Sequence, residues 1–68
     1  MKYVINLGRE LGSNTYDFLF VKSFDGADEF KKAKTQLVKT FQRLFLLVKE
    51  EIVVKDDFTI CYISFKEN

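Results

Sequence analysis

The chain has 68 residues, of which 47% are hydrophobic and 31% are charged, and its aromatic residues are eight phenylalanines and three tyrosines. This apolar content excludes intrinsic disorder and low-complexity sequence, and a single cysteine without any histidine excludes an internal disulfide and a four-ligand zinc site. Eleven Lys and Arg nearly balance ten Asp and Glu, so the net charge of +1 indicates no class of partner. The length predicts a single domain, residues 1–68, stabilised by an aromatic core or by a second chain.

No segment typical of secretion or membrane insertion is recognised. Residues 1–7 are too short and too polar for the hydrophobic part of a signal peptide. The longest unbroken apolar run, residues 44–48, is far shorter than the roughly twenty residues of a spanning helix. With Cys61 as the lone cysteine, these features predict a cytoplasmic protein that has no contact with a membrane.

Two strands are predicted in the first third of the chain. Residues 2–7 place Tyr3, Ile5 and Leu7 on one face of a strand. A connector at 8–14 follows, and the next ten residues are rich in aromatic and β-branched side chains, which is typical of a strand. A connector this short favours an antiparallel hairpin with a long loop.

A helix is predicted from about residue 27 to residue 49. Asp25 is expected to cap its first turn, and Asp28 and Glu29 place negative charge near the positive end of the helix dipole. Apolar residues then recur at steps of three and four and form one stripe. The stripe consists of Phe30, Ala33, Leu37, Phe41, Leu44 and Val48, with Val38 and Phe45 at its side.

The segment 50–54 allows two interpretations. Its β-branched residues 52–54 favour extended structure, whereas Ile52 would also extend the helical stripe. We favour a helix that frays into a loop, and the alternative is a short strand ahead of a turn at residues 56 and 57.

Residues 58–66 are predicted as the final strand, which gives the order β-β-α-β, or β-β-α-β-β under the alternative. The fold class is therefore α+β: a small antiparallel sheet of three or four strands with one long amphipathic helix on one face. A crossover through the helix would make the last strand parallel in direction to the second. With three strands, the order 2-1-3 makes every neighbouring pair antiparallel.

The outward face of the predicted helix is basic. Six basic residues and no acidic residue lie between residues 31 and 49. Such a stripe suits nucleic-acid phosphates or an acidic protein surface, and an ordinary solvated face is the alternative. An exposed leucine within this stripe favours a protein contact over a phosphate contact. The residues predicted to bind a partner through the helix are Lys31, Lys32, Lys39, Gln42, Arg43, Leu46 and Lys49.

Two predicted strands are apolar on both faces, whereas a half-buried antiparallel strand alternates apolar with polar residues. Regular alternation sets Leu19 and Val21 against the aromatic residues of the second strand, and it sets Cys61, Ile63 and Phe65 against the other apolar residues of the last strand. One helix covers only one face of a sheet, so the other face is expected to expose an apolar patch typical of an interface, unless loops fold over it. The residues predicted to form this partner or homodimer interface are Tyr16, Phe18, Phe20, Phe24, Phe58 and Tyr62.

Residues for catalysis are missing from the sequence. Without histidine, the usual serine and cysteine nucleophiles lose their general base, and Cys61 is placed like a small apolar residue within a strand. Gly8 and Gly12 precede neither the Lys-Ser/Thr pair nor the helix of a phosphate-binding loop. The acidic residues near the helix start lack the spacing of a calcium loop. We therefore expect no enzymatic activity, no metal and no cofactor.

The leading hypothesis is a small non-enzymatic protein-binding module that blocks a partner protein through its sheet face, its basic helix or both. The short length suits a small stoichiometric inhibitor, and the lean towards Lys and Phe suits an AT-rich genome such as that of many phages. The expectation is therefore an anti-defence or antitoxin-like inhibitor encoded by a phage or mobile element. The alternative is a nucleic-acid-binding domain that uses the basic helix. A structural homodimer packed sheet to sheet is a third hypothesis.

Overall fold

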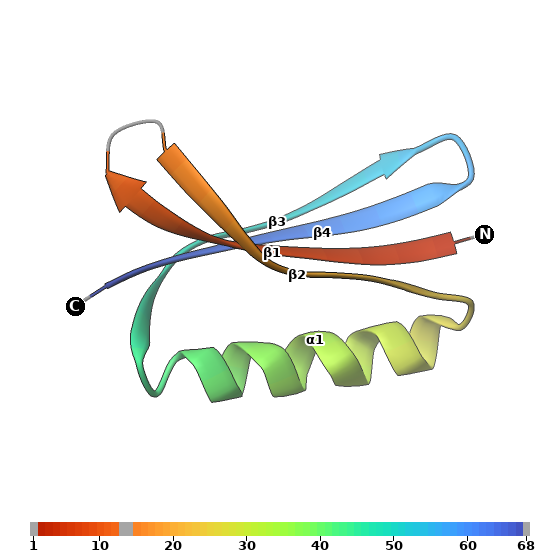
Figure 1. Ribbon diagram of the computed structural model, residues 1–68. Helices are drawn as coiled ribbons and strands as arrows, with labels where there is room; N and C mark the ends of the chain where they lie inside the picture. The colour runs from red at the N-terminus through yellow and green to blue at the C-terminus, as the bar shows by residue number, and fades with distance from the viewer. Residues whose placement is uncertain (1, 13–14, 68) are drawn as a thin grey trace.

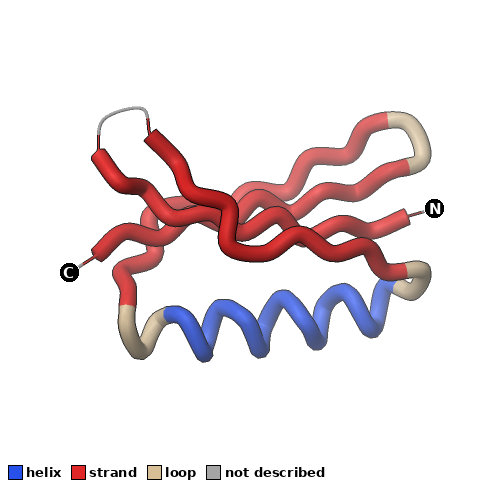
Figure 2. The backbone as a smooth tube through the Cα atoms, viewed as in Figure 1, coloured by secondary structure: helices blue, strands red, loops and turns tan. Residues whose placement is uncertain are grey.

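A computed structural model describes residues 2–12 and 15–67 of the chain (Figure 1). Figure 2 shows the strands as one layer and the helix as a second layer on one side of it. The elements in chain order are β1 (Lys2–Gly12), β2 (Thr15–Phe24), α1 (Ala27–Phe41), β3 (Phe45–Lys55) and β4 (Phe58–Glu67). The predicted α+β class is confirmed, and the observed order is the alternative of the two predicted, β-β-α-β-β.

The four strands form one mixed sheet in the order β2-β1-β4-β3. The central strands β1 and β4 run parallel, whereas each pairs antiparallel with its outer neighbour. The prediction that every neighbouring pair is antiparallel was therefore wrong. The order 2-1-3 of the three predicted strands holds, because β1 lies between β2 and β4, and β3 is added at the outer side of β4. The helix is followed by β3, which runs in the direction of β2, and the hairpin from β3 to β4 then reverses the chain.

The helix ends at Phe41, well before the predicted end at residue 49. Gln42 is the C-cap, and beyond it Leu44 N donates a hydrogen bond of 3.1 Å to Phe41 O, three residues earlier, as in a turn of 3₁₀ helix. Residues 45–55 form β3 instead, so the last third of the predicted helix, residues 42–49, and the expected fraying at 50–54 were both wrong.

The length of the buried sheet explains the shorter helix. Fifteen helical residues span about 22 Å, and the part of β1 beneath them, from Tyr3 to Arg9, spans about 20 Å. Further turns would extend past the core. As a strand, the same residues give β4 a second hydrogen-bonded neighbour.

The helix starts without the predicted cap. Gly26 is the N-cap, in an extended conformation and without a side-chain hydrogen bond, and its carbonyl accepts from Phe30 N at 3.1 Å. The capping role expected of Asp25 is wrong, whereas Asp28 and Glu29 lie in the first turn as predicted.

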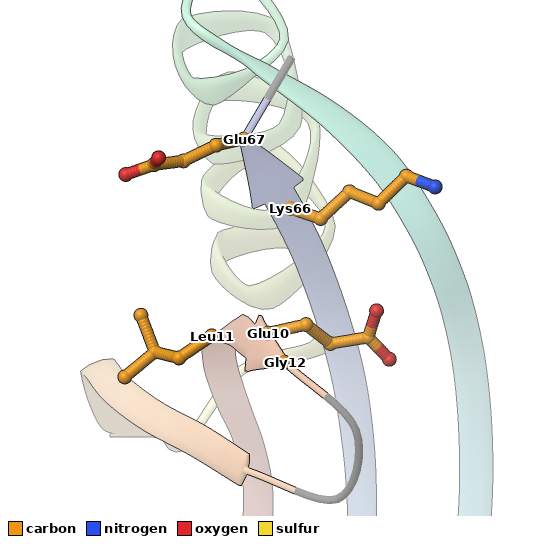
Figure 3. Close-up of a pocket in the computed structure, with 5 residues that line it drawn as sticks. All are labelled: Glu10, Leu11, Gly12, Lys66 and Glu67. Atoms are coloured by element: carbon orange, nitrogen blue, oxygen red, sulfur yellow. The ribbon is translucent and has the colours of Figure 1, made fainter.

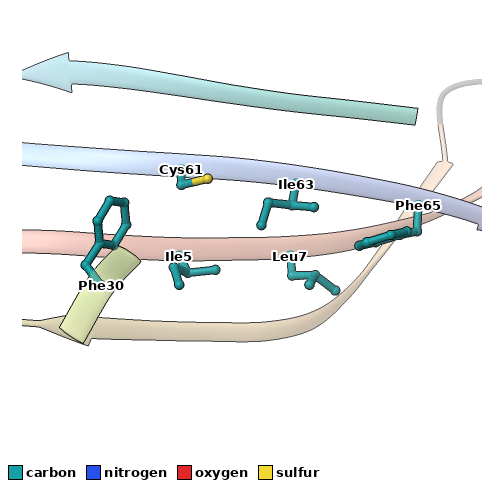
Figure 4. Packing of buried hydrophobic residues seen from close by; sticks show 6 residues of the cluster. All are labelled: Ile5, Leu7, Phe30, Cys61, Ile63 and Phe65. Carbon is teal, nitrogen blue, oxygen red and sulfur yellow. The ribbon is translucent and has the colours of Figure 1, made fainter. Parts of the chain in front are cut away.

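The core lies between α1 and the two central strands (Figure 4). A pair of aromatic rings packs at each end of the core. The ring centroids of Phe30 and Tyr3 are 5.2 Å apart, and those of Phe41 and Phe65 are 5.6 Å apart. The predicted inward faces of the first and last strands are confirmed. The buried apolar side chains are Ile5, Leu7, Phe30, Cys61, Ile63 and Phe65.

Only part of the predicted apolar stripe packs against the core. Five helical residues and one from β3 pack there: Phe30, Ala33, Leu37, Val38, Phe41 and Phe45. Leu44 and Val48 lie beyond the helix and are exposed.

A β-bulge changes the faces of β2. Leu7 is opposite Phe20 and Gly8 is opposite Phe18, so Leu19 is an extra residue in β2. Alternation therefore shifts at this point. Phe20 packs against the core on the helix side, and the expectation that it shares a face with Phe18 was wrong.

Candidate functional site

The face of the sheet opposite the helix carries no covering element among the residues that the structure describes (Figure 1). We call it the open face, and its residues follow from strand alternation and the pairings between strands. It consists of Lys2, Val4, Asn6, Gly8 and Glu10 from β1, Tyr16, Phe18, Val21 and Ser23 from β2, Leu46, Lys49, Glu51, Val53 and Lys55 from β3, and Phe58, Ile60, Tyr62, Ser64 and Lys66 from β4.

Large apolar side chains dominate the open face. Phe18 is 68% exposed and Val21 is 61% exposed, although both belong to residue types that normally fill a core. Tyr16, Phe58 and Tyr62 are also exposed. Large contiguous apolar patches are uncommon on the surfaces of monomeric proteins and are a recurrent feature of interaction surfaces.

A shallow hollow of about 380 Å³ lies in the open face. One row of paired residues crosses all four strands here, in the order Phe18, Gly8, Ser64 and Lys49. The two central members have almost no side chain, while the outer two are long. The hollow therefore has a floor of backbone and small side chains, between an aromatic wall on β2 and a charged wall on β3.

The charged groups around the hollow are paired with one another. Lys49 Nζ lies 2.9 Å from Glu51 Oε2, and this hydrogen bond raises the pKa of Lys49. On the opposite side, Tyr16 donates its hydroxyl hydrogen to Glu10 Oε1 at 3.2 Å. The rim of the hollow thus carries an ion pair, a tyrosine hydroxyl and aromatic rings.

The predicted sheet-face residues divide between the two faces. The structure brings Tyr16, Phe18 and Tyr62 together around the hollow, whereas Phe58 lies on the same face at the far end of β4, beside Lys2. Phe24, like Phe20, packs on the helix side, which corrects the prediction for both residues.

Three further residues of the open face, Val21, Gly8 and Ser64, were not predicted from the sequence. The bulge moves Val21 there. Gly8 was assigned to a connector, and it forms the floor of the hollow because β1 continues through it and pairs with Ser64. A small residue inside an otherwise bulky strand is the signal that was available for Ser64.

The predicted basic helix face is not one surface. Lys31, Lys32 and Lys39 are exposed on α1. The other predicted members lie elsewhere: Gln42 and Arg43 are in the turn after the helix, and Leu46 and Lys49 are on β3. The last two face away from the helix, so their assignment to a helix face was wrong.

A second hollow, of about 310 Å³, lies between the ends of β1 and β4 (Figure 3). Figure 3 shows that Glu10 and Lys66 point to one side and that Leu11 and Glu67 point to the other. The two carboxylates therefore do not converge as a general acid and base would.

The single thiol lies under the helix. Cys61 is fully buried, and burial raises the pKa of its thiol. A protonated thiol without access to solvent is a poor nucleophile. Among the described residues, no three carboxylate or cysteine side chains are grouped to hold a metal ion.

In the described part of the chain, no helix has the length and apolar character needed to cross a membrane. Comparisons with protein-family models, curated proteins and solved structures give no match to this chain.

Proposed function

We propose that this protein acts by binding another protein through the open face. The observation that carries the proposal is the exposure of Tyr16, Phe18 and Tyr62 around a hollow floored by backbone. Aromatic residues that surround a concave site are the usual anchors of a protein interface. The partner would insert an apolar side chain into the hollow and contact the paired charges at its rim.

Such a protein would work by occupying a surface of its partner, as a stoichiometric inhibitor does. The basis is that the described residues gather no catalytic group, while Cys61 is buried and the carboxylates at the end of β1 and β4 diverge. Binding that depends on apolar contact should be little affected by moderate salt, since screening acts on exposed charges.

Photo-crosslinking in the source cell tests this proposal. A benzoylphenylalanine at Phe18 is expected to give one protein adduct, and the same group at Thr35, on the outer surface of α1, is the matched control. Co-expression of the unlabelled wild-type protein should reduce the amount of the adduct, because it occupies the partner. Co-expression of the double variant Phe18→Ser/Val21→Ser should leave the amount of the adduct unchanged. Adducts from position 35 alone would contradict the proposal.

Nucleic-acid binding by α1 is the second candidate. Lys31, Lys32 and Lys39 are exposed, and none of them takes part in an ion pair found among the described residues. Three phosphate contacts would give an affinity that falls with salt at a slope of about −3 on a double logarithmic plot. Fluorescence polarisation with labelled DNA and RNA measures that slope, and K31E/K32E/K39E should abolish it.

A further inference from the structure

Beyond a bulge at Val48, the outer edge of β3 is regular and carries exposed apolar side chains. Residues 49–55 pair with β4 without interruption, whereas the bulge at Leu19 breaks the opposite edge of the sheet. Ile52 is 52% exposed and Val54 is 65% exposed, although both lie on the helix side of the sheet. An exposed, regular and apolar edge is a template for pairing with another strand.

The backbone of this edge has free hydrogen-bonding groups at alternate residues. A two-residue turn joins β3 to β4 and closes on the pair of Lys55 and Phe58. Such a turn closes on a hydrogen-bonded pair, and in an antiparallel ladder these pairs alternate with non-hydrogen-bonded ones. The N–H and C=O groups of Ile52 and Val54 therefore point away from β4.

The five residues 51–55 read Glu-Ile-Val-Val-Lys and complement themselves in the reverse direction. In an antiparallel pairing centred on Val53, Glu51 lies opposite Lys55 of a second copy, and Ile52 lies opposite Val54. Each contact occurs twice because the arrangement has a two-fold axis. Opposite charges and β-branched pairs placed directly across strands both stabilise a sheet.

The neighbouring registers are unfavourable because each places like charges opposite one another. Centring the pairing on residue 51 places Glu51 opposite Glu51 of the second copy, and centring it on residue 55 places Lys55 opposite Lys55. Centring it on residue 52 sets Lys49 against Lys55, and centring it on residue 54 sets Glu51 against Asp57. The register centred on Val53 also brings two acids together, Glu50 and Asp56, and Lys34 lies 3.2 Å from Glu50. Of these registers it alone adds attractive pairs, because Glu51 lies opposite Lys55 and Lys49 lies opposite Asp57.

We propose that β3 pairs with β3 of a second copy of this chain, antiparallel and centred on Val53. The pairing joins two four-stranded sheets into one continuous sheet. Its two-fold axis is perpendicular to the sheet, so both helices lie on one side and both open faces lie on the other. The interface is small, which makes the dimer dependent on protein concentration. This proposal uses a different surface from the proposed function and does not rest on it.

Charge reversal tests the register. E51K places a lysine opposite Lys55 of the second copy, and K55E places a glutamate opposite Glu51, so each variant alone should remain monomeric. An equal mixture of the two restores an attractive pair and should dimerise. Sedimentation from about 1 to 500 µM should show wild type and the mixture moving towards twice 8.0 kDa, and each single variant staying at 8.0 kDa. Circular dichroism of each variant verifies the fold.

A disulfide trap tests the centre of the pairing. With Cys61→Ala as background, Val53→Cys should form a covalent dimer under a mild oxidant, because a non-hydrogen-bonded pair has Cα atoms about 4.5 Å apart and a disulfide accepts that distance. Glu51→Cys is the matched control, since the two copies of residue 51 would lie more than about 10 Å apart.

Three results would overturn the proposal. The first is a wild-type chain that stays at 8.0 kDa at every concentration. The second is a wild-type dimer that both charge variants retain, or that their mixture fails to restore, because the dimer would then use another surface. The third is equal crosslinking at positions 51 and 53. Crosslinking at Phe18 to a cellular partner reports separately on the open face.

Discussion

The two faces of the sheet carry similar apolar side chains in different surroundings. On the helix side, Phe65 is fully buried and lies against Phe41. On the open face, Phe18 is 68% exposed, and no described element covers it. One face therefore supplies the stability of the fold, and the other leaves apolar area for a contact. The comparison shows that the composition of a strand does not reveal which of its faces is the core.

The largest expected difference between the faces comes from removing a ring. Phe65→Ala should lower the free energy of unfolding by about 3–5 kcal/mol, since it loses buried area and leaves a cavity, whereas Phe18→Ala should cost less than about 1 kcal/mol. Urea unfolding followed by circular dichroism measures both. If Phe65→Ala does not fold, Ile63→Val, with an expected cost of about 0.5–1.5 kcal/mol, serves in its place. Equal costs on the two faces would contradict the comparison.

Thiol labelling should distinguish the faces next. Burial raises the pKa of Cys61 above the usual 9.0, so at pH 8 it is protonated as well as inaccessible. Alkylation by iodoacetamide should be at least about a hundredfold slower in the native protein than in urea, because it requires opening of the core. The variant Val21→Cys/Cys61→Ala places the thiol on the open face and should react about as fast as in urea. Mass spectrometry follows both reactions.

A smaller effect is expected from filling the hollow. An added Cβ at Gly8 would lie 3.6 Å from Asp17 O and 3.8 Å from Tyr16 Cδ1, which are ordinary contacts. Gly8→Ala should therefore raise the free energy of unfolding by about 0.5–1 kcal/mol, because glycine inside a strand is unfavourable. The same change makes the hollow shallower, so it should weaken capture of the partner at Phe18. Unchanged capture would place the contact elsewhere on the open face.

The smallest effect concerns the link between the helix and β3. Lys34 Nζ lies 3.2 Å from Glu50 Oε1, with both side chains partly exposed. Glu50→Gln should lower the free energy of unfolding by less than about 1 kcal/mol, and high salt should reduce that difference. A double-mutant cycle with Lys34→Met isolates the pair. A coupling well above this value would mean that the helix depends on β3 for its position.

The sequence predicts the faces of β1 and β4 because their alternation has no interruption. The faces of β2 were not predictable, since Leu19 becomes an extra residue only when β2 pairs with β1, and nothing local marks it. For β3, the apolar residues at 45, 48 and 52 fit both a helical stripe and a strand. The choice between them depends on how much of the sheet the helix can cover.

The candidate site was predictable to the same extent. Tyr16, Phe18, Phe58 and Tyr62 stand out as excess apolar residues, and the structure places them on the open face. The hollow was not predictable because its floor pairs Gly8 with Ser64, two residues far apart in the chain. The basic stripe was overestimated because the chain leaves the helix before Arg43 and Lys49.

The parallel pairing of β1 with β4 has a consequence for synthesis. Ile5 and Leu7 are buried against Cys61 and Ile63, which belong to the last of the four strands of this sheet in chain order. A nascent chain can form the hairpin of β1 and β2 early. The side chains of β1 that face the helix nevertheless remain exposed to solvent until β4 has left the ribosome. The core therefore closes only once β4 can pair with β1, as expected where distant strands must meet. A ribosome-bound chain in which β4 has not yet emerged should be open to proteases, and it should become resistant once β4 is outside the ribosome.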